Sequence, residues 1–397
     1  MREVKIMYLM EYPIDLPGGG QMSTQTLAEG IVQASAGEDN KTTGVIFKPI
    51  VVCPTLLTKK ITDYPFEIVT YVTDENRELS KVSRIKNFLS RIGDFARIIR
   101  CKKPDIIHVS MSESLISFGF LRVPGFFRDI PFVYTDRGLC YGYRKWSKFC
   151  IMHTMKRAAR MLTTTEFNRA LWEQEQVKCP ITVIPNTISK AFDDYEEGKR
   201  ERLKAKYSLT KDDFVIGFAG RVSEEKDWPC VRRLIGALKE TQIPFKVALV
   251  MSTYEERDAQ IVADVKDGIT SQIGEERLIF MENLSQSEIS EYYYMVDVFV
   301  MTSIFESFGK AAVEAMSRKC AVLSTAVGGL PEVIGKDENL YDSSKPEELA
   351  VRMKYLYEHR DILDEDREFF YERYRNNYRK EVNVERHINL YKEVLGL

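Results

Sequence analysis

Several classes of protein are excluded by what this sequence of 397 residues lacks. It contains no run of about 18 apolar residues, so no membrane-spanning helix is expected. Its seven cysteines are odd in number, scattered and never spaced as C-x-x-C, which argues against a disulfide framework or a zinc site and predicts reduced thiols in a cytoplasmic protein. The apolar run in the opening MREVKIMYLMEYP is too short for a secretory signal and is interpreted as a buried strand.

The sequence also has little net charge, −2, but the two signs are unevenly distributed. Residues 1–195 carry 27 lysines and arginines against 21 acidic residues, whereas the remainder carries 30 against 38. The basic first half favours an anionic acceptor, or a peripheral contact with the inner face of an anionic membrane. Chance variation over a large surface is an equally good explanation. No nucleic acid partner is expected.

Hydrophobic periodicity indicates two α/β domains, as the length of the chain also suggests. Runs rich in β-branched and aromatic residues recur in both halves, at 4–10, 105–110, 131–135, 161–165 and 181–185, and again at 214–220, 245–251, 277–281, 297–302 and 320–325. Amphipathic stretches separate these runs, and this alternation predicts two doubly wound, Rossmann-like parallel sheets. In such proteins the ligand lies in a cleft that faces the carboxyl ends of the strands.

A polar stretch at 186–213 marks the seam between the domains. We expect one Rossmann-like domain at 1–190, a second at 191–375, and a helix at 376–397 that could pack back on the first. A helix at 82–100 is predicted to bury one face, formed by Ile85, Phe88, Leu89, Ile92, Phe95, Ala96 and Ile99. Its basic face suits either a lipid surface or plain solvent, and the apolar segment 117–129 is a second candidate for contact with an acceptor or a membrane.

The stretch ESFGKAAVE, residues 306–314, follows the predicted strand at 297–302 and opens a helix. Free amides at a helix start, near Ser307 and Gly309, favour a phosphate. Glu306 and Glu314 on either side could accept hydrogen bonds from hydroxyl groups, so the pattern suits a ligand with a central phosphate, such as a nucleotide sugar. The alternative is structural: Glu306 caps the helix and Glu314 pairs with Lys310 four residues before it.

Three other loops follow predicted strands. In FVIGFAGRVSEEKDW, residues 214–228, Gly220 makes a turn, and Arg221 with Lys226 could neutralise a diphosphate without a metal. In AVGGLPEVI, residues 326–334, two glycines allow backbone to approach a ligand closely. Gly18, Gly19 and Gly20 follow the first strand, but they do not match the G-x-G-x-x-G fingerprint of nicotinamide cofactors.

Taken in order, GRVSEEKD, ESFGKAAVEA and STAVGGLPEVI resemble the donor-binding half of the retaining GT-B glycosyltransferases of family 4, also called glycosyl transferases group 1. VIPNTIS at 183–189 resembles the family's interdomain signature, and PDIIHVS with GGGQ resembles features of its first half. The resemblance implies that the first domain binds the acceptor and the second binds a nucleotide-diphosphate sugar.

The resemblance also implies roles for individual residues. Arg221, Lys226 and Glu306 would be catalytic, the two cations at the leaving diphosphate and the carboxylate at the sugar hydroxyls. The donor would further contact a set of residues in both domains: Gly19, Gly20, Gly220, Ser307, Phe308, Gly309, Lys310 and Glu314. Glu314 would hold the ribose hydroxyls, and Lys310 would be tolerated at a helix start because phosphate lies nearby.

Two departures from the family pattern concern its histidine and its Gly-x-Gly. The histidine usual after the strand FVYT is absent, so Asp136 or Arg137 could take its place, and MSTYEER replaces the usual Gly-x-Gly after 245–251. Among the histidines present, His108 is expected to be structural rather than catalytic. His153, His359 and His387 lie in helical patterns and are expected at the surface, whereas EYYYM at 291–295 is expected in the core.

The sequence thus predicts a cytoplasmic, metal-independent hexosyltransferase that needs no cofactor. It would move a sugar from a nucleotide-diphosphate donor, UDP-sugar favoured, to a glycan, lipid-linked or protein acceptor in polysaccharide or glycoconjugate synthesis. The alternatives are a nucleotide-sugar epimerase of the same fold and a non-catalytic relative that binds a glycan or a partner protein.

Overall fold

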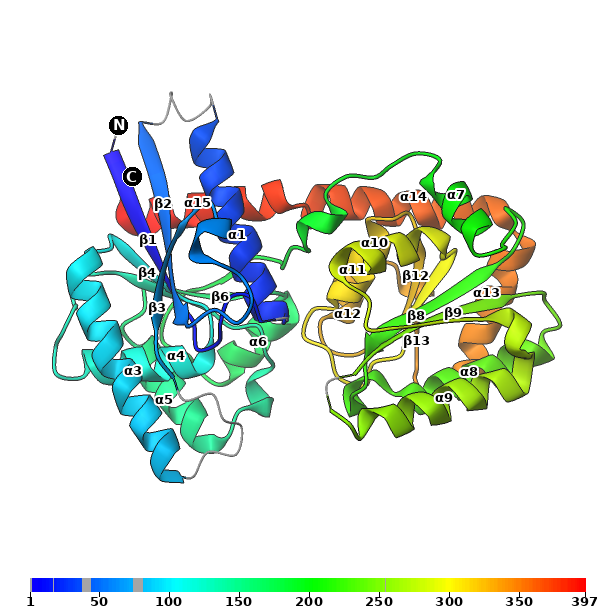
Figure 1. Cartoon of the computed structure of the whole chain (residues 1–397), viewed down its shortest axis with the longest axis horizontal. Coiled ribbons are helices and arrows are strands. Elements are labelled where there is room, and N and C mark those ends of the chain that lie inside the picture. The colour runs from blue at the N-terminus through cyan, green and yellow to red at the C-terminus, as the bar shows by residue number, and fades with distance from the viewer. Residues whose placement is uncertain (1, 17, 38–43, 74–80, 254) are drawn as a thin grey trace. The chain divides into compact units, whose positions relative to one another are not determined.

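The computed structural model describes residues 2–16, 18–37, 44–73, 81–253 and 255–397. The chain divides into two compact units. Unit 1 comprises Met1–Thr187 and Lys380–Leu397, and unit 2 comprises Ile188–Arg379. Each unit holds one parallel sheet with helices on both faces (Figure 1).

The described part of unit 1 forms a seven-stranded parallel sheet in the order β3-β2-β1-β4-β5-β6-β7. The strands are β1 (Arg2–Leu9), β2 (Val45–Pro54), β3 (Glu67–Tyr71), β4 (Ile106–Val109), β5 (Phe132–Thr135), β6 (Arg160–Thr163) and β7 (Ile181–Val183). Side chains alternate between the two faces, as the pleat requires. In β1, Met7 and Leu9 join one core, and Ile6 and Tyr8 join the other.

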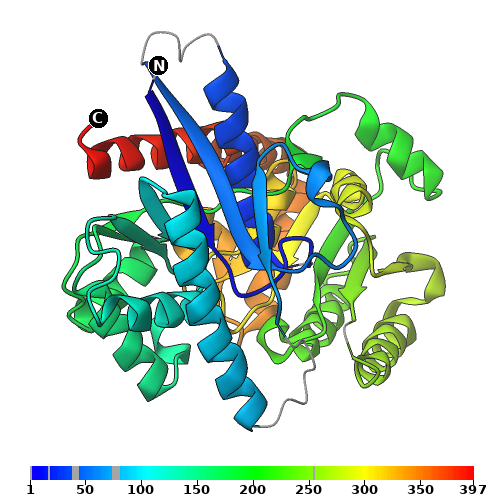
Figure 2. The ribbon, with the colours of Figure 1, turned by 60° about the vertical axis from the view of Figure 1, so that its left-hand side comes forward.

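Helices cover both faces of this sheet. They are α1 (Gly19–Ala36), α3 (Lys81–Lys102), α4 (Ser112–Arg122), α5 (Lys145–Met155), α6 (Glu166–Gln174) and α15 (Lys380–Leu395). The helices α3, α4, α5 and α6 contribute to one core, and α1 with α15 contributes to the other. Figure 2 gives a second view, in which α3 is the long cyan helix.

The last helix, α15, reaches unit 1 only after the chain has passed through unit 2. It packs against α1 and buries Val384, Leu390 and Tyr391. The Tyr391 hydroxyl lies 2.6 Å from His108 Nδ1 and 3.1 Å from the hydroxyl of Tyr8, both of which are buried. The helix thus completes both the apolar core and a polar network of unit 1.

The described part of unit 2 forms a six-stranded parallel sheet in the order β10-β9-β8-β11-β12-β13. The strands are β8 (Val215–Arg221), β9 (Lys246–Ser252), β10 (Leu278–Glu282), β11 (Val298–Met301), β12 (Ala321–Thr325) and β13 (Leu340–Tyr341). The helices are α7 (Lys199–Lys206), α8 (Trp228–Glu240), α9 (Asp258–Ile273), α10 (Gln286–Met295), α11 (Lys310–Met316), α12 (Leu330–Ile334), α13 (Pro346–Glu358) and α14 (Arg360–Asn377).

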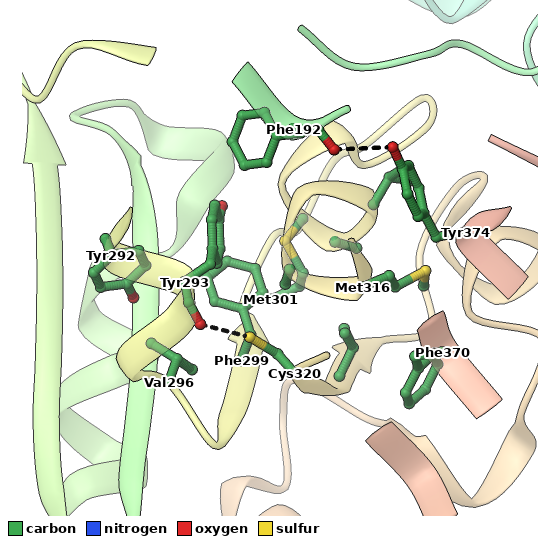
Figure 3. Close-up of a cluster of buried hydrophobic side chains, with 14 of the residues drawn as sticks. Phe192, Tyr292, Tyr293, Val296, Phe299, Met301, Met316, Cys320, Phe370 and Tyr374 are labelled. Carbon is green, nitrogen blue, oxygen red and sulfur yellow. Dashed lines mark hydrogen bonds between the residues drawn. The ribbon is translucent and has the colours of Figure 1, made fainter. Parts of the chain in front are cut away.

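The two faces of this sheet have separate cores. The helices α8, α9 and α13 pack on one face, and α10, α11, α12 and α14 pack on the other. Figure 3 shows the second core, in which the rings of Tyr293 and Phe299 meet edge to face and the Tyr374 hydroxyl donates to the Phe192 carbonyl. The EYYYM stretch is therefore core, as predicted, with Tyr292, Tyr293 and Tyr294 buried.

A buried carboxylate ties four elements of unit 2 together. Asp297 is 2% exposed and accepts hydrogen bonds from Lys204 Nζ at 2.9 Å and from the Val215 amide at 2.8 Å. It also pairs with Arg200 at 3.3 Å and with Arg367. The start of β8, the start of β11 and the helices α7 and α14 are therefore joined through one side chain.

The predicted fold class, two doubly wound parallel α/β sheets, is confirmed. Each of the predicted strand runs overlaps an observed strand, whereas β2, β3 and β13 were not predicted. Pro49 lies inside β2, opposite Ile6 of β1, and an internal proline is ordinarily evidence against a strand. The stretch 186–213 is more than a polar connection, because Phe192 is fully buried and α7 forms within it.

Two predictions on burial are wrong. On α3, Ile85 and Leu89 are 61% and 60% exposed, although the helical period places them on the apolar face. His387 is buried rather than at the surface, because α15 packs on the sheet and its Nδ1 lies 2.8 Å from the Asn383 carbonyl oxygen. His153 and His359 are exposed, as predicted. Among the described residues, no helix is both long and apolar enough to cross a membrane.

Candidate functional site

Three loops at the carboxyl ends of β8, β11 and β12 are hydrogen-bonded to one another in unit 2. The Thr302 hydroxyl, after β11, donates to the Lys226 carbonyl at 2.6 Å, and the Ile304 amide donates to the Glu225 carbonyl at 2.9 Å. At the end of β12, the Thr325 hydroxyl donates to the Ser303 carbonyl at 2.6 Å. The carboxyl ends of neighbouring parallel strands meet at one edge of a sheet, so these loops form one surface.

The glycine pair after β12 lets its loop approach Glu306. The Gly329 amide donates to the Glu306 carbonyl at 3.2 Å. Gly328 has a φ of +56°, and a Cβ there would lie 1.9 Å from the same carbonyl oxygen. Only glycine fits this position without a shift of backbone. The glycines of AVGGLPEVI are thus required for contact between two loops, whether or not a ligand is bound.

Lys226 and Glu306 form the centre of this surface. Lys226 Nζ lies 2.8 Å from Glu306 Oε2 and 3.3 Å from Ser303 Oγ, and both charged side chains are 19% exposed. The stem of Lys226 crosses Gly220, where a Cβ would lie 3.3 Å from Lys226 Cγ. The structure therefore brings together three of the predicted site residues, Gly220, Lys226 and Glu306.

A small pocket opens beside Lys226. Its lining comes from the ends of β8 and β11 and from the start of α8: Phe218, Ala219, Lys226, Trp228, Val300, Met301, Thr302 and Ser303. Ser303 is fully buried and contacts Lys226 directly. The sequence reasoning missed this serine, although a polar residue just after a predicted strand was the available signal.

Arg221 is the last residue of β8, and its side chain is exposed. Its carbonyl accepts a hydrogen bond from Trp228 Nε1 at 3.1 Å, which fixes the backbone at the loop start. The pKa of Glu225 is lowered, first by the neighbouring Ser223 side chain and in part by the charges of Arg221 and Lys226. Both cations thus contribute positive potential over the same loop.

The helix α11 begins at Lys310, one residue after Gly309. Gly309 adopts a φ of +92°, and a Cβ there would lie 2.5 Å from Leu330 Cδ2, so glycine is required for two reasons. Phe308 is buried, with its ring edge-on to Tyr378 at 5.7 Å. Its side chain is therefore part of the core, and its backbone amide is the group left to meet a ligand.

Glu314 lies one turn into α11. Its Oε2 accepts a hydrogen bond from the Tyr293 hydroxyl at 3.2 Å. Burial raises the pKa of Glu314 to about 7, against the opposing effects of Lys310 and the Tyr293 hydroxyl. Lys310 therefore acts on Glu314 electrostatically, and Tyr293 is a hydrogen-bond partner that the sequence did not reveal.

Gly19 and Gly20 belong to unit 1, where they form the first turn of α1. A Cβ on Gly20 would lie 3.1 Å from the Met111 methyl group, in the loop after β4. Gly19 has open space around it. Their predicted contact with a donor stays a prediction.

The two residues that follow β5, Asp136 and Arg137, have different surroundings. Asp136 is buried and accepts hydrogen bonds from Trp172 Nε1 at 2.6 Å and from Tyr143 at 2.5 Å, so its carboxylate is committed to the core. Arg137 donates to the Ser110 carbonyl at 2.9 Å and lines a small pocket of unit 1 with Asn186 and His387. Arg137 therefore suits the place of the missing histidine better than Asp136.

His108 is structural, as expected. Both of its ring nitrogens lie 2.6 Å from a hydroxyl oxygen, one from Tyr391 and the other from Thr135. Burial lowers the pKa of His108, so the ring is neutral. In the part of the chain that the structure describes, no group of three or more His, Cys, Asp or Glu residues is arranged to hold a metal.

Comparisons with known proteins give this arrangement a family. The model for "Glycosyl transferases group 1" matches residues 199–377, and the model for "Glycosyltransferase Family 4" matches residues 48–192. The two matches cover the hydrogen-bonded loops of unit 2 described above and most of unit 1. The chain therefore belongs to the GT-B glycosyltransferases of family 4.

Individual relatives agree with this assignment. The 2-deoxystreptamine glucosyltransferase of Streptomyces kanamyceticus is 29% identical over 185 residues, which is 46% of either chain. The lipopolysaccharide 1,2-N-acetylglucosaminetransferase of Salmonella typhimurium is 23% identical over 44% of this chain and 46% of its own. The match thus spans about half the length of these relatives. The fold of Anabaena Alr3699/HepE, solved in complex with UDP, is similar with a TM-score of 0.79 at 16% identity, covering 98% of this chain and 100% of that one.

Proposed function

We propose that this glycosyltransferase moves a hexose from a UDP-sugar to a glycan, lipid-linked or protein acceptor during synthesis of a surface polysaccharide or glycoconjugate. The observation that carries the proposal is the contact of Lys226 with Glu306 where β8, β11 and β12 end. The UDP in the Anabaena structure supports the choice of base. The relative that acts on lipopolysaccharide supports a glycan acceptor.

In this proposal Lys226 and Arg221 neutralise the diphosphate as it leaves. Negative charge grows on the leaving group while the bond from the anomeric carbon to the phosphate oxygen breaks, so cations fixed beforehand stabilise the transition state. This role needs no metal. Glu306 would exchange its contact with Lys226 for one with sugar hydroxyls, and the amides of Phe308 and Gly309 would meet sugar and phosphate.

The remaining donor contacts follow the same surface. Ser307 and Lys310 would lie beside the phosphates, since both flank the start of α11. Glu314 would accept hydrogen bonds from the ribose hydroxyls when it is ionised. Gly19 and Gly20, in the first turn of α1, would also contact the donor.

The reaction is proposed to retain the anomeric configuration, with the leaving group departing from the face that the acceptor hydroxyl attacks. The acceptor would bind to unit 1, and a peripheral contact with an anionic membrane would bring a lipid-linked acceptor within reach. Proton NMR of the product linkage tests retention directly, because α and β anomers give different coupling constants.

The first experiment is a screen of nucleotide sugars for stabilisation of the fold. A ligand at a hundred times its Kd raises the free energy of unfolding by about 2.7 kcal/mol, which a thermal melt detects. Glu306→Gln should lose this effect, whereas Glu358→Gln, an exposed residue of α13, should keep it. Failure of every common donor would favour a non-catalytic protein. Conversion of a donor into its epimer without an acceptor would instead favour an epimerase.

A further inference from the structure

Exposed apolar side chains gather on three neighbouring helices of unit 1. The surface is formed by Ile85 and Leu89 of α3, Phe120 and Val123 at the end of α4, and Trp146 and Phe149 of α5. Each is between 44% and 68% exposed. We call this set the α3–α5 patch. Scattered exposed apolar residues are ordinary, but a contiguous group of this kind marks a contact surface.

Ring contacts show that the patch is continuous from helix to helix. The ring of Phe88 meets that of Phe120 edge-on at 5.4 Å, which joins α3 to α4. The Phe120 ring in turn stacks on Trp146 at 6.5 Å, which joins α4 to α5. The three helices come from separate parts of the sequence, and only the fold brings the exposed row together.

The apolar row is flanked by cations. Arg84 and Lys86 of α3, and Arg144 and Lys145 at the start of α5, are exposed. Among the residues that the structure describes, none of the four forms an ion pair, whereas Asp94 and Glu113 are engaged with other arginines. Apolar side chains beside unpaired cations suit the interface of an anionic bilayer.

A second copy of this chain fits the patch less well. If two such patches faced each other, the cations of one copy would lie against those of the other, and like charges repel. These cations are Arg84, Lys86, Arg144 and Lys145. Trp146 also favours a lipid surface, because tryptophan prefers the boundary between headgroups and acyl chains. Lysine and arginine stems can lie along apolar surface while their charges stay in water.

We infer that the α3–α5 patch is the surface by which unit 1 docks on an anionic lipid bilayer, with Trp146 and Phe149 entering the headgroup region. This inference rests on the membrane contact included in the proposed function and assigns it to named side chains. Docking there would hold the acceptor-binding unit against the membrane that supplies a lipid-linked acceptor.

Tryptophan fluorescence tests the inference on the unaltered protein. Of the three tryptophans, Trp172 and Trp228 are buried and Trp146 is 60% exposed, so Trp146 alone can respond to a surface contact. Vesicles of phosphatidylglycerol and phosphatidylcholine should shift its emission to the blue, and brominated acyl chains should quench it. Pure phosphatidylcholine vesicles should have little effect, and added salt should weaken the response.

Two double variants locate the surface in a vesicle flotation assay. Arg144→Ser with Lys145→Ser should lower partitioning about 30-fold, since each cation near an anionic surface contributes about fivefold. Trp146→Ser with Phe149→Ser should lower it about tenfold or more. The control, Lys211→Ser with Val351→Ser, makes the same kinds of change at exposed positions of unit 2 and should bind like the unaltered protein.

Donor binding is measured on the same samples, so the two proposals can fail separately. Loss of vesicle binding with intact donor stabilisation supports the inference. Absence of quenching by brominated anionic vesicles, or unchanged partitioning of both patch variants, overturns it and leaves the transferase proposal standing. A dimer that Trp146→Ser with Phe149→Ser dissociates, without any vesicle binding, overturns it in favour of a second copy.

Discussion

Replacement of Lys226 by methionine tests the centre of the proposed site. Methionine keeps the stem that crosses Gly220, while the ammonium group 2.8 Å from Glu306 is lost. Removing one preorganised donor from a developing anion costs about 2.7–4 kcal/mol in the transition state, so kcat should fall about 100-fold to 1000-fold. The ion pair is partly exposed and contributes about 1 kcal/mol or less to stability, so the variant should fold.

The assay compares initial rates at a saturating concentration of the donor found by screening. The variant's melting temperature should lie within about 4 °C of the unaltered protein, since hydrogen bonds from the Thr302 hydroxyl and the Ile304 amide hold the loops together. Lys239→Met, at the exposed end of α8, is the matched control. A kcat within threefold of the unaltered enzyme would refute the role of Lys226, and a large loss of stability would mean that the pair is mainly structural.

Three further predictions concern stability and pH. Asp297→Ala leaves three cations without their carboxylate and should lower the free energy of unfolding by about 3–5 kcal/mol in a urea titration; a loss under 1 kcal/mol would contradict the ion cluster. Because the pKa of Glu314 is raised from 4.5 to about 7 in the folded protein, its contribution to stability is complete below pH 4.5 and is lost as the pH rises through 7. Donor affinity should rise over the same upper range as Glu314 ionises, and Glu314→Gln should remove this dependence in calorimetry. Gly328→Ala should destabilise the fold by at least about 1–3 kcal/mol, because its backbone is left-handed and its Cβ meets a carbonyl, whereas Gly93→Ala, with open space, should not.

The fold could be predicted because buried parallel strands appear in a sequence as short apolar runs. The run at 131–135 appears as β5 at Phe132–Thr135, and the run at 320–325 appears as β12 at Ala321–Thr325. The strand β2 was not predicted, and Pro49 interrupts its run of apolar residues. In the fold, Pro49 is paired with Ile6, and a missing amide in one position does not prevent the rest of the strand from pairing.

The candidate site could be predicted in part, since catalytic groups cluster where parallel strands end. Lys226 and Glu306 are 80 positions apart, and their places after two predicted strands, together with the family resemblance, suggested that they meet. Burial could not be predicted in the same way. The helical period places Ile85 with Phe95, but only Phe95 lies under neighbouring elements, and His387 is covered because α15 returns to a sheet made hundreds of residues earlier.

The return of α15 to unit 1 affects when unit 1 can fold during synthesis of the chain. At 5–20 residues per second, the ribosome needs roughly 10–40 seconds to synthesise unit 2 after unit 1 has emerged. Throughout that interval the nascent first unit lacks Val384, Leu390 and Tyr391, so part of its apolar interior is open and His108 has no Tyr391 hydroxyl beside it. Unit 1 therefore cannot complete its folding before the ribosome has synthesised unit 2 and α15. Until α15 packs on it, unit 1 stays incompletely folded and accessible to chaperones and proteases.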